Sequence, residues 1–489
     1  MRRLHQQLIL GLLETIKEAQ KQELYVDCQE GALAIIEFVN QQEGEGTRTV
    51  ELLNEYINLL DQVRKGEANN NVLRKQLFRI ESCIKTELKP NKYKALFLPY
   101  YDNTWESMRS VYEAFAQDPL FETEVVIIPI IRNTNEGLKF VWRDYLTPTG
   151  ISNTHFDQYS FEIDQPDVVF YNQPYDGVNI PKFQSANIRK YARLMVYIPY
   201  YGMKLVGSRT ARRERTRRES IHRCDLFIAQ SKSYCEHYLK KSSLYSKVLI
   251  HGNPKCDALY AAKHKGKYTR YPKWEEAIGN RRAILFNTHY SYMMDGVPLH
   301  PGVIRLLEDI IKYEDLFLIW RPHPQAFLMK LSSQMEALLE LAYTHERMIV
   351  DRTPNILSAF MYAYAFVSLF PSSLVMDALF LDLPTFIMGL LDDRADSSIS
   401  DPSFYTAVSH EDISKSPPDS DAGSEAVRQY VEECIYKPLD LFLEEVRSGK
   451  DSRYIARQEF RIREFPTQDG TVGNKILESV KMRLSNETL

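Results

Sequence analysis

The segment Trp320-Arg-Pro-His-Pro324 carries residue types that are well suited to binding a phosphate group. It follows the apolar run 316–320, which is typical of a buried strand in a parallel sheet. The end of such a strand faces the ligand site of an open α/β sheet, so we expect Arg321 and His323 there. An arginine fork and an imidazole both donate hydrogen bonds to phosphate oxygens, and the prolines restrict the backbone that holds them. The alternative is a rigid turn in which His323 only caps a neighbouring carbonyl.

A second segment, Phe370-Pro-Ser-Ser-Leu-Val-Met-Asp377, follows the apolar run 365–369 and is expected to begin a helix. Ser372 and Ser373 would lie at the N-terminus of that helix, where free N–H groups and the helix dipole bind anions. Asp377 would face the same site one turn later. Serines are also ordinary helix caps, and that interpretation stays open.

Two other segments place polar residues after apolar runs of the strand type. In Asp351-Arg-Thr-Pro-Asn355, we expect Thr353 either to cap the next helix or to contact a base or ribose. In His251-Gly-Asn-Pro-Lys-Cys-Asp257, the glycine permits a tight turn. Asp257 is expected to hold that turn or a hinge between domains, and His251 has a structural or a catalytic role.

Short apolar runs alternate with helical stretches through most of the chain, and this alternation predicts parallel sheets. The first series of runs covers 94–99, 124–129, 167–171, 194–198, 226–229 and 248–250. The second series covers 283–286, 316–320, 348–350, 365–369 and 385–388. We therefore expect an α/β fold with two Rossmann-like, doubly wound lobes, at 91–265 and at 275–445. Such lobes bind ligands in the cleft between them, beyond the carboxyl ends of their strands.

Both ends of the chain are predicted to be helical. Apolar residues recur at helical spacing within residues 1–90, for example Leu8, Leu12 and Ile16, which predicts an α-helical N-terminal domain. These helices either contact a membrane or pair with a second copy of the chain. The stretch 425–445 is helical again, and packing back across the first lobe is one arrangement open to it. Residues 446–489 form a C-terminal tail.

The composition is that of an ordinary globular protein with two or three domains, since 44% of its 489 residues are hydrophobic and 26% are charged. A net charge of -4 argues against a dedicated nucleic-acid-binding protein. The six cysteines are scattered without a CxxC pair, a spacing that indicates neither a zinc site nor a disulfide framework. We therefore expect the protein in a reducing cytoplasm. No signal-peptide pattern is visible, and the longest apolar stretch, 359–370, is too short to span a bilayer.

The order of the segments resembles the CDP-glycerol glycerophosphotransferase family, whose members build the poly(glycerol phosphate) chains of teichoic acids and related cell-surface polymers. The resemblance covers roughly 93 to 400. A Gly-x-Pro-Lys-x-Asp turn ends at Asp257, a strand ends in Asn287-Thr288, and Arg-Pro-His-Pro and Ser-Ser-x-x-x-Asp follow. The resemblance implies a GT-B fold, with the CDP-linked donor bound by the C-terminal lobe.

On this resemblance, Arg321 and His323 contact the donor phosphates, Ser372 and Ser373 surround the diphosphate, and Asp377 orients the nucleotide. A hydroxyl of a polymer or lipid-linked acceptor attacks the β-phosphate of CDP-glycerol or a related CDP-alditol, and CMP leaves. The chemistry is phosphoryl transfer, in which positioning and charge stabilisation dominate. The CDP-linked donor is a substrate, no cofactor is implied, and nothing in the sequence demands a metal.

The sequence departs from the family pattern at the residue expected to act as the base. Many members carry Trp-His-Gly-Thr-Pro in the first lobe, but Pro199 stands at the position of that histidine. In the second lobe, Phe370-Pro replaces Asp-Tyr before the two serines. The remaining candidates for the base are His289, Asp102 and His251. An imidazole is suited to proton abstraction at neutral pH.

The acceptor side falls to the first lobe, with Tyr200, Lys204 and Asp257. The arginine-rich run 204–218 is either a solvated helix face or a contact with anionic lipid or a polyanionic acceptor. The second interpretation would place a cytoplasmic protein at the inner face of the plasma membrane. Two other functions stay open: a GT-B glycosyltransferase that uses a nucleotide sugar, and a non-catalytic paralogue that scaffolds polymer synthesis.

Overall fold

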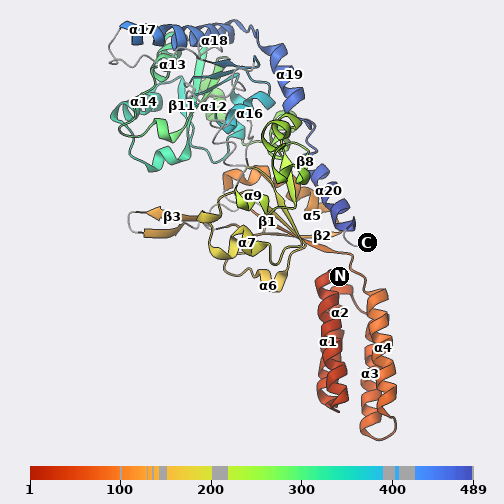
Figure 1. Ribbon diagram of the computed structural model, residues 1–489. Helices are drawn as coiled ribbons and strands as arrows, with labels where there is room; N and C mark the ends of the chain where they lie inside the picture. Colours follow the sequence, from red (N-terminus) through yellow and green to blue (C-terminus); the bar gives the residue numbers. More distant parts are fainter. Residues whose placement is uncertain are drawn as a thin grey trace.

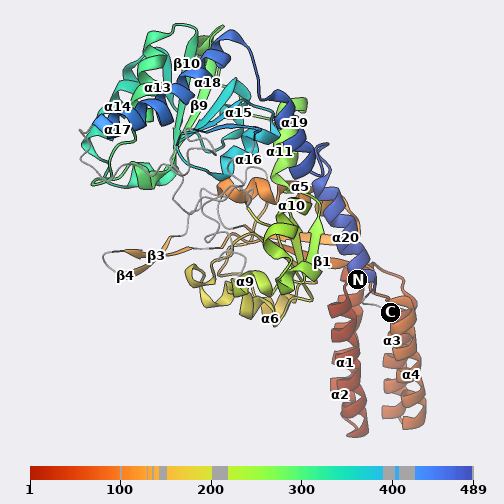
Figure 2. The same cartoon turned by 45° about the horizontal axis from the view of Figure 1, so that its top comes forward.

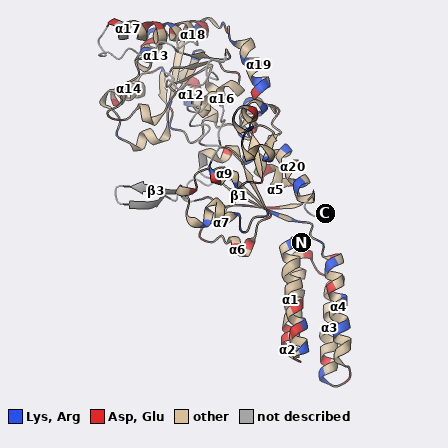
Figure 3. Ribbon diagram, in the orientation of Figure 1, with Lys and Arg blue, Asp and Glu red and all other residues tan. Residues whose placement is uncertain are grey.

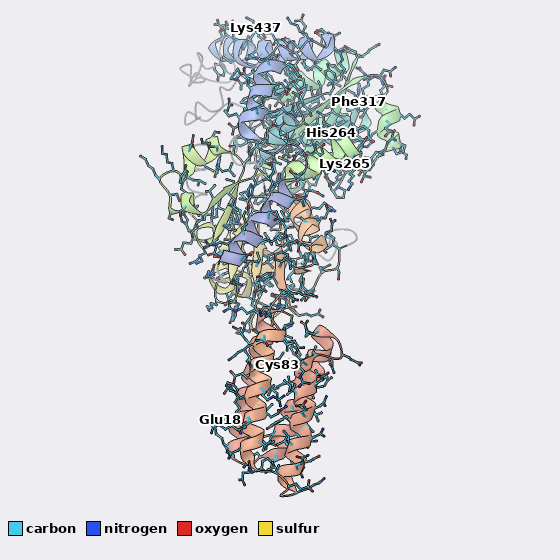
Figure 4. All side chains as sticks on the ribbon, turned by 90° about the vertical axis from the view of Figure 1, so that its right-hand side faces the viewer. Glu18, Cys83, His264, Lys265, Phe317 and Lys437 are labelled. Carbon is cyan, nitrogen blue, oxygen red and sulfur yellow. The ribbon has the colours of Figure 1, made fainter. Side chains whose placement is uncertain are left out.

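Three bodies follow one another along the molecule: a helical bundle and two lobes that are each built around a sheet (Figure 1). The structure is a computed structural model and describes residues 1–99, 102–128, 130–134, 137–141, 151–200, 218–388, 402–406 and 425–486. Acidic and basic residues are interspersed over all three bodies (Figure 3). Glu18 and Cys83 lie on the bundle, at the opposite end of the molecule from Lys437 (Figure 4).

The N-terminal body consists of four helices joined by short loops, α1 (Arg3–Lys21), α2 (Tyr25–Glu43), α3 (Arg48–Arg64) and α4 (Asn70–Glu87). The bundle projects away from the lobes (Figures 1 and 2). In α1 the buried residues recur every three or four positions, at Ile9, Leu13, Ile16 and Gln20. One face of the helix therefore enters the core of the bundle, as the spacing predicts.

The first lobe contains a six-stranded sheet in the order β2-β1-β5-β6-β7-β8, in which neighbouring strands are parallel. Its strands are β1 (Tyr93–Leu98), β2 (Phe121–Val125), β5 (Val168–Tyr171), β6 (Leu194–Tyr197), β7 (Leu226–Ala229) and β8 (Val248–Ile250). The prediction of a strand at 124–129 is wrong in its position. The apolar residues after Val125 are buried outside the strand, so the apolar run marks the core and not the strand itself.

Helices cover both faces of this sheet, as a doubly wound lobe requires. One face carries α5 (Arg109–Gln117) and the C-terminal helix α20 (Val472–Asn486). The other face carries the short helices α6 (Phe161–Asp164), α7 (Ser185–Ile188), α9 (Glu219–His222) and α10 (Lys232–Tyr234). An antiparallel hairpin of β3 (Ile130–Thr134) and β4 (Gly137–Val141), which the sequence did not predict, extends from the lobe (Figure 1).

The second lobe contains a parallel six-stranded sheet in the order β11-β10-β9-β12-β13-β14, the order typical of Rossmann folds. Its strands are β9 (Arg282–Thr288), β10 (Leu316–Pro322), β11 (Met348–Val350), β12 (Ala365–Ser368), β13 (Thr385–Ile387) and β14 (Tyr405–Thr406). One face is covered by α13 (Pro301–Lys312), α14 (Ser333–Thr344) and α18 (Lys437–Ser448). The other is covered by α11 (Lys255–Lys265), α12 (Pro272–Ile278), α15 (Leu357–Tyr362) and α16 (Ser373–Phe380).

The C-terminal part of the chain divides between the two lobes. Helix α18 buries Leu439, Phe442 and Leu443 in the core of the second lobe, so the stretch 425–445 does not pack across the first lobe. The crossing is made later, by α19 (Tyr454–Glu464) and α20 (Figure 2). The apolar stripe of α20 completes the core of the first lobe, which explains why the chain returns there.

Candidate functional site

The polar residues of the second lobe gather where its strand order reverses, between β9 and β12. His289 follows β9, His323 follows β10, and Ser372 follows β12. Asn287 joins these ends, since its Nδ2 donates to Arg321 O at 3.0 Å and its Oδ1 accepts from Ser372 Oγ at 3.4 Å. Open α/β sheets bind their ligands at this reversal, so we take it as the candidate functional site.

Residues that follow β11 hold the guanidinium of Arg321. Its Nη1 donates to the carboxylate of Asp351 and to Thr353 Oγ1 at 3.1 Å, and its Nη2 donates to Thr353 O at 2.8 Å. The Asp351 side chain is fully buried, so loss of the arginine would leave an unpaired buried carboxylate. The guanidinium of Arg321 is therefore held beside the end of β11, with its charge balanced by Asp351 and its position set by Thr353.

His289 and His323 lie beside each other, with their ring centroids 5.3 Å apart. In His323, Nδ1 accepts the backbone N–H of Gln325 at 3.2 Å. In His289, Nδ1 lies 2.7 Å from Ser291 Oγ, a contact in which either atom can donate, and 3.4 Å from the backbone nitrogen of Ser291. A neutral imidazole that accepts at Nδ1 carries its proton on Nε2. Among the described residues neither Nε2 has a partner, so His323 offers a free N–H donor and His289 offers a free Nε2.

Burial keeps both imidazoles uncharged at neutral pH. It lowers the pKa of His289 below its ordinary value. It lowers the pKa of His323 to about 4, with a smaller contribution from the neighbouring His289. His323 therefore acts at pH 7 as a neutral hydrogen-bond donor, because its Nδ1 is occupied and its Nε2 carries the proton. That state suits the binding of a phosphate oxygen better than the removal of a proton from a substrate.

Aromatic rings surround the histidine pair. Tyr290 lies 5.2 Å from His323, and Phe370 lies 6.4 Å from His289 and 5.5 Å from Tyr292 between ring centroids. The loops after β9 and β10 are joined, since Met294 pairs with Leu331 in an isolated antiparallel bridge. The joined loops fix the aromatic surroundings of the two imidazoles and limit the exposure of the rings.

The N-terminus of α16 lies at the end of β12 and is not capped by a side chain. Ser372 is the N-cap residue, but its hydroxyl makes no cap hydrogen bond and instead contacts Asn287 and Ser368, each at 3.4 Å. The first N–H groups of a helix have no partner within the helix. Ser373 is the first residue of α16, so the two serines lie where the sequence predicts.

Asp377 lies one turn further into α16, where it pairs with Lys255 at the start of α11. Burial raises the pKa of the Asp377 carboxyl, and the ammonium of Lys255 opposes that rise. The expectation that Asp377 orients a nucleotide stays a prediction. The structure shows that Asp377 has Lys255 as its partner. This ion pair joins the segments 251–257 and 370–377, which the sequence presents separately.

Two other predicted residues contact the C-terminal helix and not the second sheet. His251 Nε2 lies 2.8 Å from Ser479 Oγ in α20, and burial, together with Lys475, lowers the pKa of His251. The Asp257 carboxylate accepts the backbone N–H groups of Val472 and Gly473, at 3.1 and 2.9 Å, and so caps α20 from outside. Asp257 thus holds the start of α20, and the turn, hinge and acceptor-side roles given to it from the sequence stay predictions.

The remaining predicted residues belong to the first lobe. Tyr200 packs against the core of this lobe, beyond the end of β6. Asp102 begins the 3-10 helix η1 (Asp102–Ser107), which follows β1. The side chain of Asp102 lies outside the described part of the chain, as do Lys204 and most of the arginine-rich run.

Sequence reasoning missed Glu106, a residue of η1 that contacts the second lobe. Its side chain is 11% exposed, and its Oε1 accepts from Asn355 Nδ2 of the second lobe at 3.3 Å. Its Oε2 also accepts from Arg109 Nε at 3.0 Å. Glu106 lies where the strand order of the first sheet reverses, between β1 and β5. The only signal in the sequence was its place shortly after a predicted strand.

No protein-family model matches the sequence, and no curated protein sequence matches it. Solved structures do match. The UDP-GlcNAc 2-epimerase of Neisseria meningitidis, bound to UDP-GlcNAc, is 13% identical with a TM-score of 0.50, over 80% of this chain and 100% of that one. The S. aureus MnaA–UDP structure is 14% identical with a TM-score of 0.52, over 80% of this chain and 97% of that one. The chain has the GT-B fold.

The wall teichoic acid polymerase TagF also matches this GT-B chain. The H548A structure of that protein is 12% identical and has a TM-score of 0.47, over 91% of this chain and 100% of that one. Within the described residues no helix is long and apolar enough to cross a membrane, and no group of three His, Cys, Asp or Glu side chains is placed to hold a metal ion.

Proposed function

We propose that this protein binds a CDP-linked alditol, such as CDP-glycerol, and transfers its alditol phosphate to an acceptor hydroxyl with release of CMP. The observation that carries the proposal is the meeting of His289, His323, Arg321 and Ser372 at the strand-order reversal of the second sheet. This set supplies neutral imidazoles and a serine hydroxyl, and the guanidinium of Arg321 lies beside the end of the neighbouring strand β11. The order of the sequence motifs supports cytidine as the nucleotide and an alditol phosphate as the transferred group.

The chemistry needs little more than positioning and charge stabilisation. A bond forms between the acceptor oxygen and the β-phosphorus as the bond from that phosphorus to the CMP oxygen breaks, and CMP leaves with the electron pair. The Nε2–H groups of His289 and His323 donate to the phosphate oxygens, on which the charge is concentrated. In this role both rings carry their proton on Nε2, so the acceptor proton goes to another group.

Asp102 is the base that we retain. His289 is occupied as a hydrogen-bond donor, and His251 contacts Ser479 on the C-terminal helix. Asp102 belongs to η1, the same short helix that carries Glu106 to the second lobe. A carboxylate performs the corresponding role in protein kinases, where it accepts the proton of the substrate hydroxyl.

The test measures binding and turnover separately. Calorimetric titration with CDP, UDP and GDP should show a preference for CDP, and CDP-glycerol with a primed acceptor should release CMP. A preference for UDP or GDP would indicate an enzyme of nucleotide sugars, such as a GT-B glycosyltransferase. Binding of CDP-glycerol without release of CMP would indicate the scaffolding paralogue, and no nucleotide binding at all would reject the proposal.

A matched pair of variants ties the result to the site. His323→Asn should weaken CDP binding about tenfold, because it removes one donor to a charged phosphate. His345→Asn is the control, since His345 Nδ1 also accepts a backbone N–H two residues on, from Arg347 at 3.2 Å. His345 precedes β11, so it lies at the amino ends of the strands, whereas the candidate site lies beyond their carboxyl ends. Its variant should bind CDP as the wild type does.

A further inference from the structure

Lys255 begins α11, the helix that packs against both lobes. Helix α11 contacts α5 and η1 of the first lobe and α15 and α16 of the second. The Nζ of Lys255 donates to Asp377 Oδ2 in α16, and the two side chains are only 12% and 7% exposed. A lysine from the connection between the lobes is therefore buried against the helix that begins at the candidate site.

The pairing places the ammonium close to the N-terminus of α16. Side chains of an α-helix lean toward its N-terminus and cover the preceding turn. The carboxylate of Asp377 therefore lies beside the turn that begins at Ser373. An ammonium bound to that carboxylate is about one helical turn, ~5 Å, from the first N–H groups of the helix.

Lys255 still has hydrogen-bond donors to offer. An ammonium group has three N–H donors. Within the described residues, Asp377 is the one acceptor recorded for this group. The guanidinium of Arg321 differs, since Asp351 and Thr353 already accept three of its hydrogen bonds. Of these two cations, Lys255 has the larger share of its donors left for a ligand.

We propose that Lys255 is a ligand of the donor diphosphate and that Asp377 is the residue that positions its ammonium. This assignment rests on the proposed function and names a further residue of the same site. The ligand class is a nucleoside diphosphate derivative, whose phosphates would lie between the N-terminus of α16 and Lys255. The rival explanation is a purely structural pair that fastens α11 to α16 and makes no contact with a ligand.

The comparison that separates the two explanations uses Asp377→Asn as the reference protein. That substitution preserves shape and removes the carboxylate, so a further Lys255→Met leaves no buried unpaired charge. By calorimetry with CDP and with inorganic pyrophosphate, the double variant should bind each probe about tenfold or more weakly than Asp377→Asn alone. Asp377→Asn itself should bind each probe more weakly than the wild type, because the ammonium of Lys255 loses the carboxylate that positions it.

Lys263→Met is the control on the same helix. Lys263 Nζ donates to Leu381 O, just beyond the C-terminal end of α16, so its loss should leave the affinity for both probes unchanged. Equal affinity in Asp377→Asn and in the double variant would overturn the assignment of Lys255 and leave the proposed function standing. Failure of the wild type to bind either probe would reject both.

Discussion

At the scale of single residues, one local arrangement recurs among the histidines of the second lobe. His289, His300 and His323 each accept at Nδ1 the backbone N–H of the residue two positions on. The imidazole thus replaces the serine or aspartate that usually caps a short helix. The arrangement places the proton on Nε2 in His300 and His323, while Nδ1 of His289 also lies 2.7 Å from Ser291 Oγ.

These three rings make stability depend on pH. Burial lowers the pKa of His289, and it lowers the pKa of His300 and of His323 to about 4 each. In the unfolded chain their pKa is about 6.5. Between these values the unfolded chain binds more protons than the folded one, so the free energy of unfolding decreases as the pH falls from about 6.5 toward 4. Urea unfolding at pH 7.5 and at pH 5 should show this loss.

The variant His323→Gln isolates the contribution of one ring. It cannot take up a proton when the chain unfolds, so it should lose less stability than the wild type between the same two pH values. His264→Gln serves as the control, since His264 lies exposed on α11, where Figure 4 labels it, and should behave like the wild type. An unchanged pH dependence in His323→Gln would contradict the prediction.

The sequence predicted which residues stand at the strand ends but not what they touch. Arg321, His323 and Ser372 follow buried apolar runs, and that pattern placed them on one edge of a sheet. The pairing of Lys255 with Asp377 spans 122 positions, and nothing local signals it. The tautomer of His289 depends on a turn at Ser291, which spacing alone does not specify.

At the scale of elements, helix α20 packs against α5 through Gly473. Among the described glycines, Gly473 has the least room for a Cβ atom. A Cβ atom at Gly473 would lie 2.3 Å from Ser110 O and 2.5 Å from Ser110 C. Because backbone atoms cannot move aside as a flexible side chain can, Gly473→Ala should separate the two helices. We expect it to cost about 2 kcal/mol or more of the free energy of unfolding. Faster hydrogen exchange along α20 would locate the loss.

Gly11→Ala is the matched control for that substitution. Gly11 lies inside α1, and a Cβ atom there would meet nothing within 4 Å. Alanine in an exposed helix interior should stabilise the protein by about 0.5–1 kcal/mol, because glycine loses more backbone entropy on folding. If Gly473→Ala were as harmless as Gly11→Ala, the close packing of α20 on α5 would be refuted.

Most strands were predictable from the sequence, and the pairing of elements was less so. Ten of the eleven predicted apolar runs correspond in position to strands, because parallel strands buried on both faces are apolar throughout. The hairpin of β3 and β4 was missed. The sequence predicted a helix at 425–445 but only a C-terminal tail at 446–489, and it did not indicate that α18 covers the second lobe and α20 the first.

At the scale of the whole molecule, contacts from α11 and the C-terminal segment join the two lobes. Glu464, at the end of α19, is fully buried and accepts from Ser231 Oγ at 2.7 Å and from Ser233 Oγ at 2.7 Å in the first lobe. Asp257 caps α20 from α11. Asn355 reaches Glu106 across the lobes. A ligand at the second sheet can therefore influence the first lobe through polar contacts as well as through the chain connection.

The helical bundle stands apart from these connections. Its core contains only residues from Met1 to Leu88, among them the fully buried Leu13, Leu53 and Leu73. Arg2 anchors it to the first lobe by donating to Asp164 O and Gln165 O at 2.7 and 2.9 Å. Four helices around a core of their own are sufficient for a small domain to fold. Residues 1–90 should therefore fold as an isolated fragment.

Urea unfolding of that fragment, followed by far-UV circular dichroism, should be a single cooperative transition, with an m-value of about 1 kcal/mol/M as for other small domains. A helical signal that decays without a transition would show that the bundle depends on the lobes.

The complementary fragment, 91–489, retains every residue of the candidate site. It should bind CDP as the full chain does, because Lys255, Arg321, His323 and α16 share no core cluster with the bundle. A loss of affinity in that fragment would mean that the bundle shapes the site through Arg2, the residue that bonds to the first lobe.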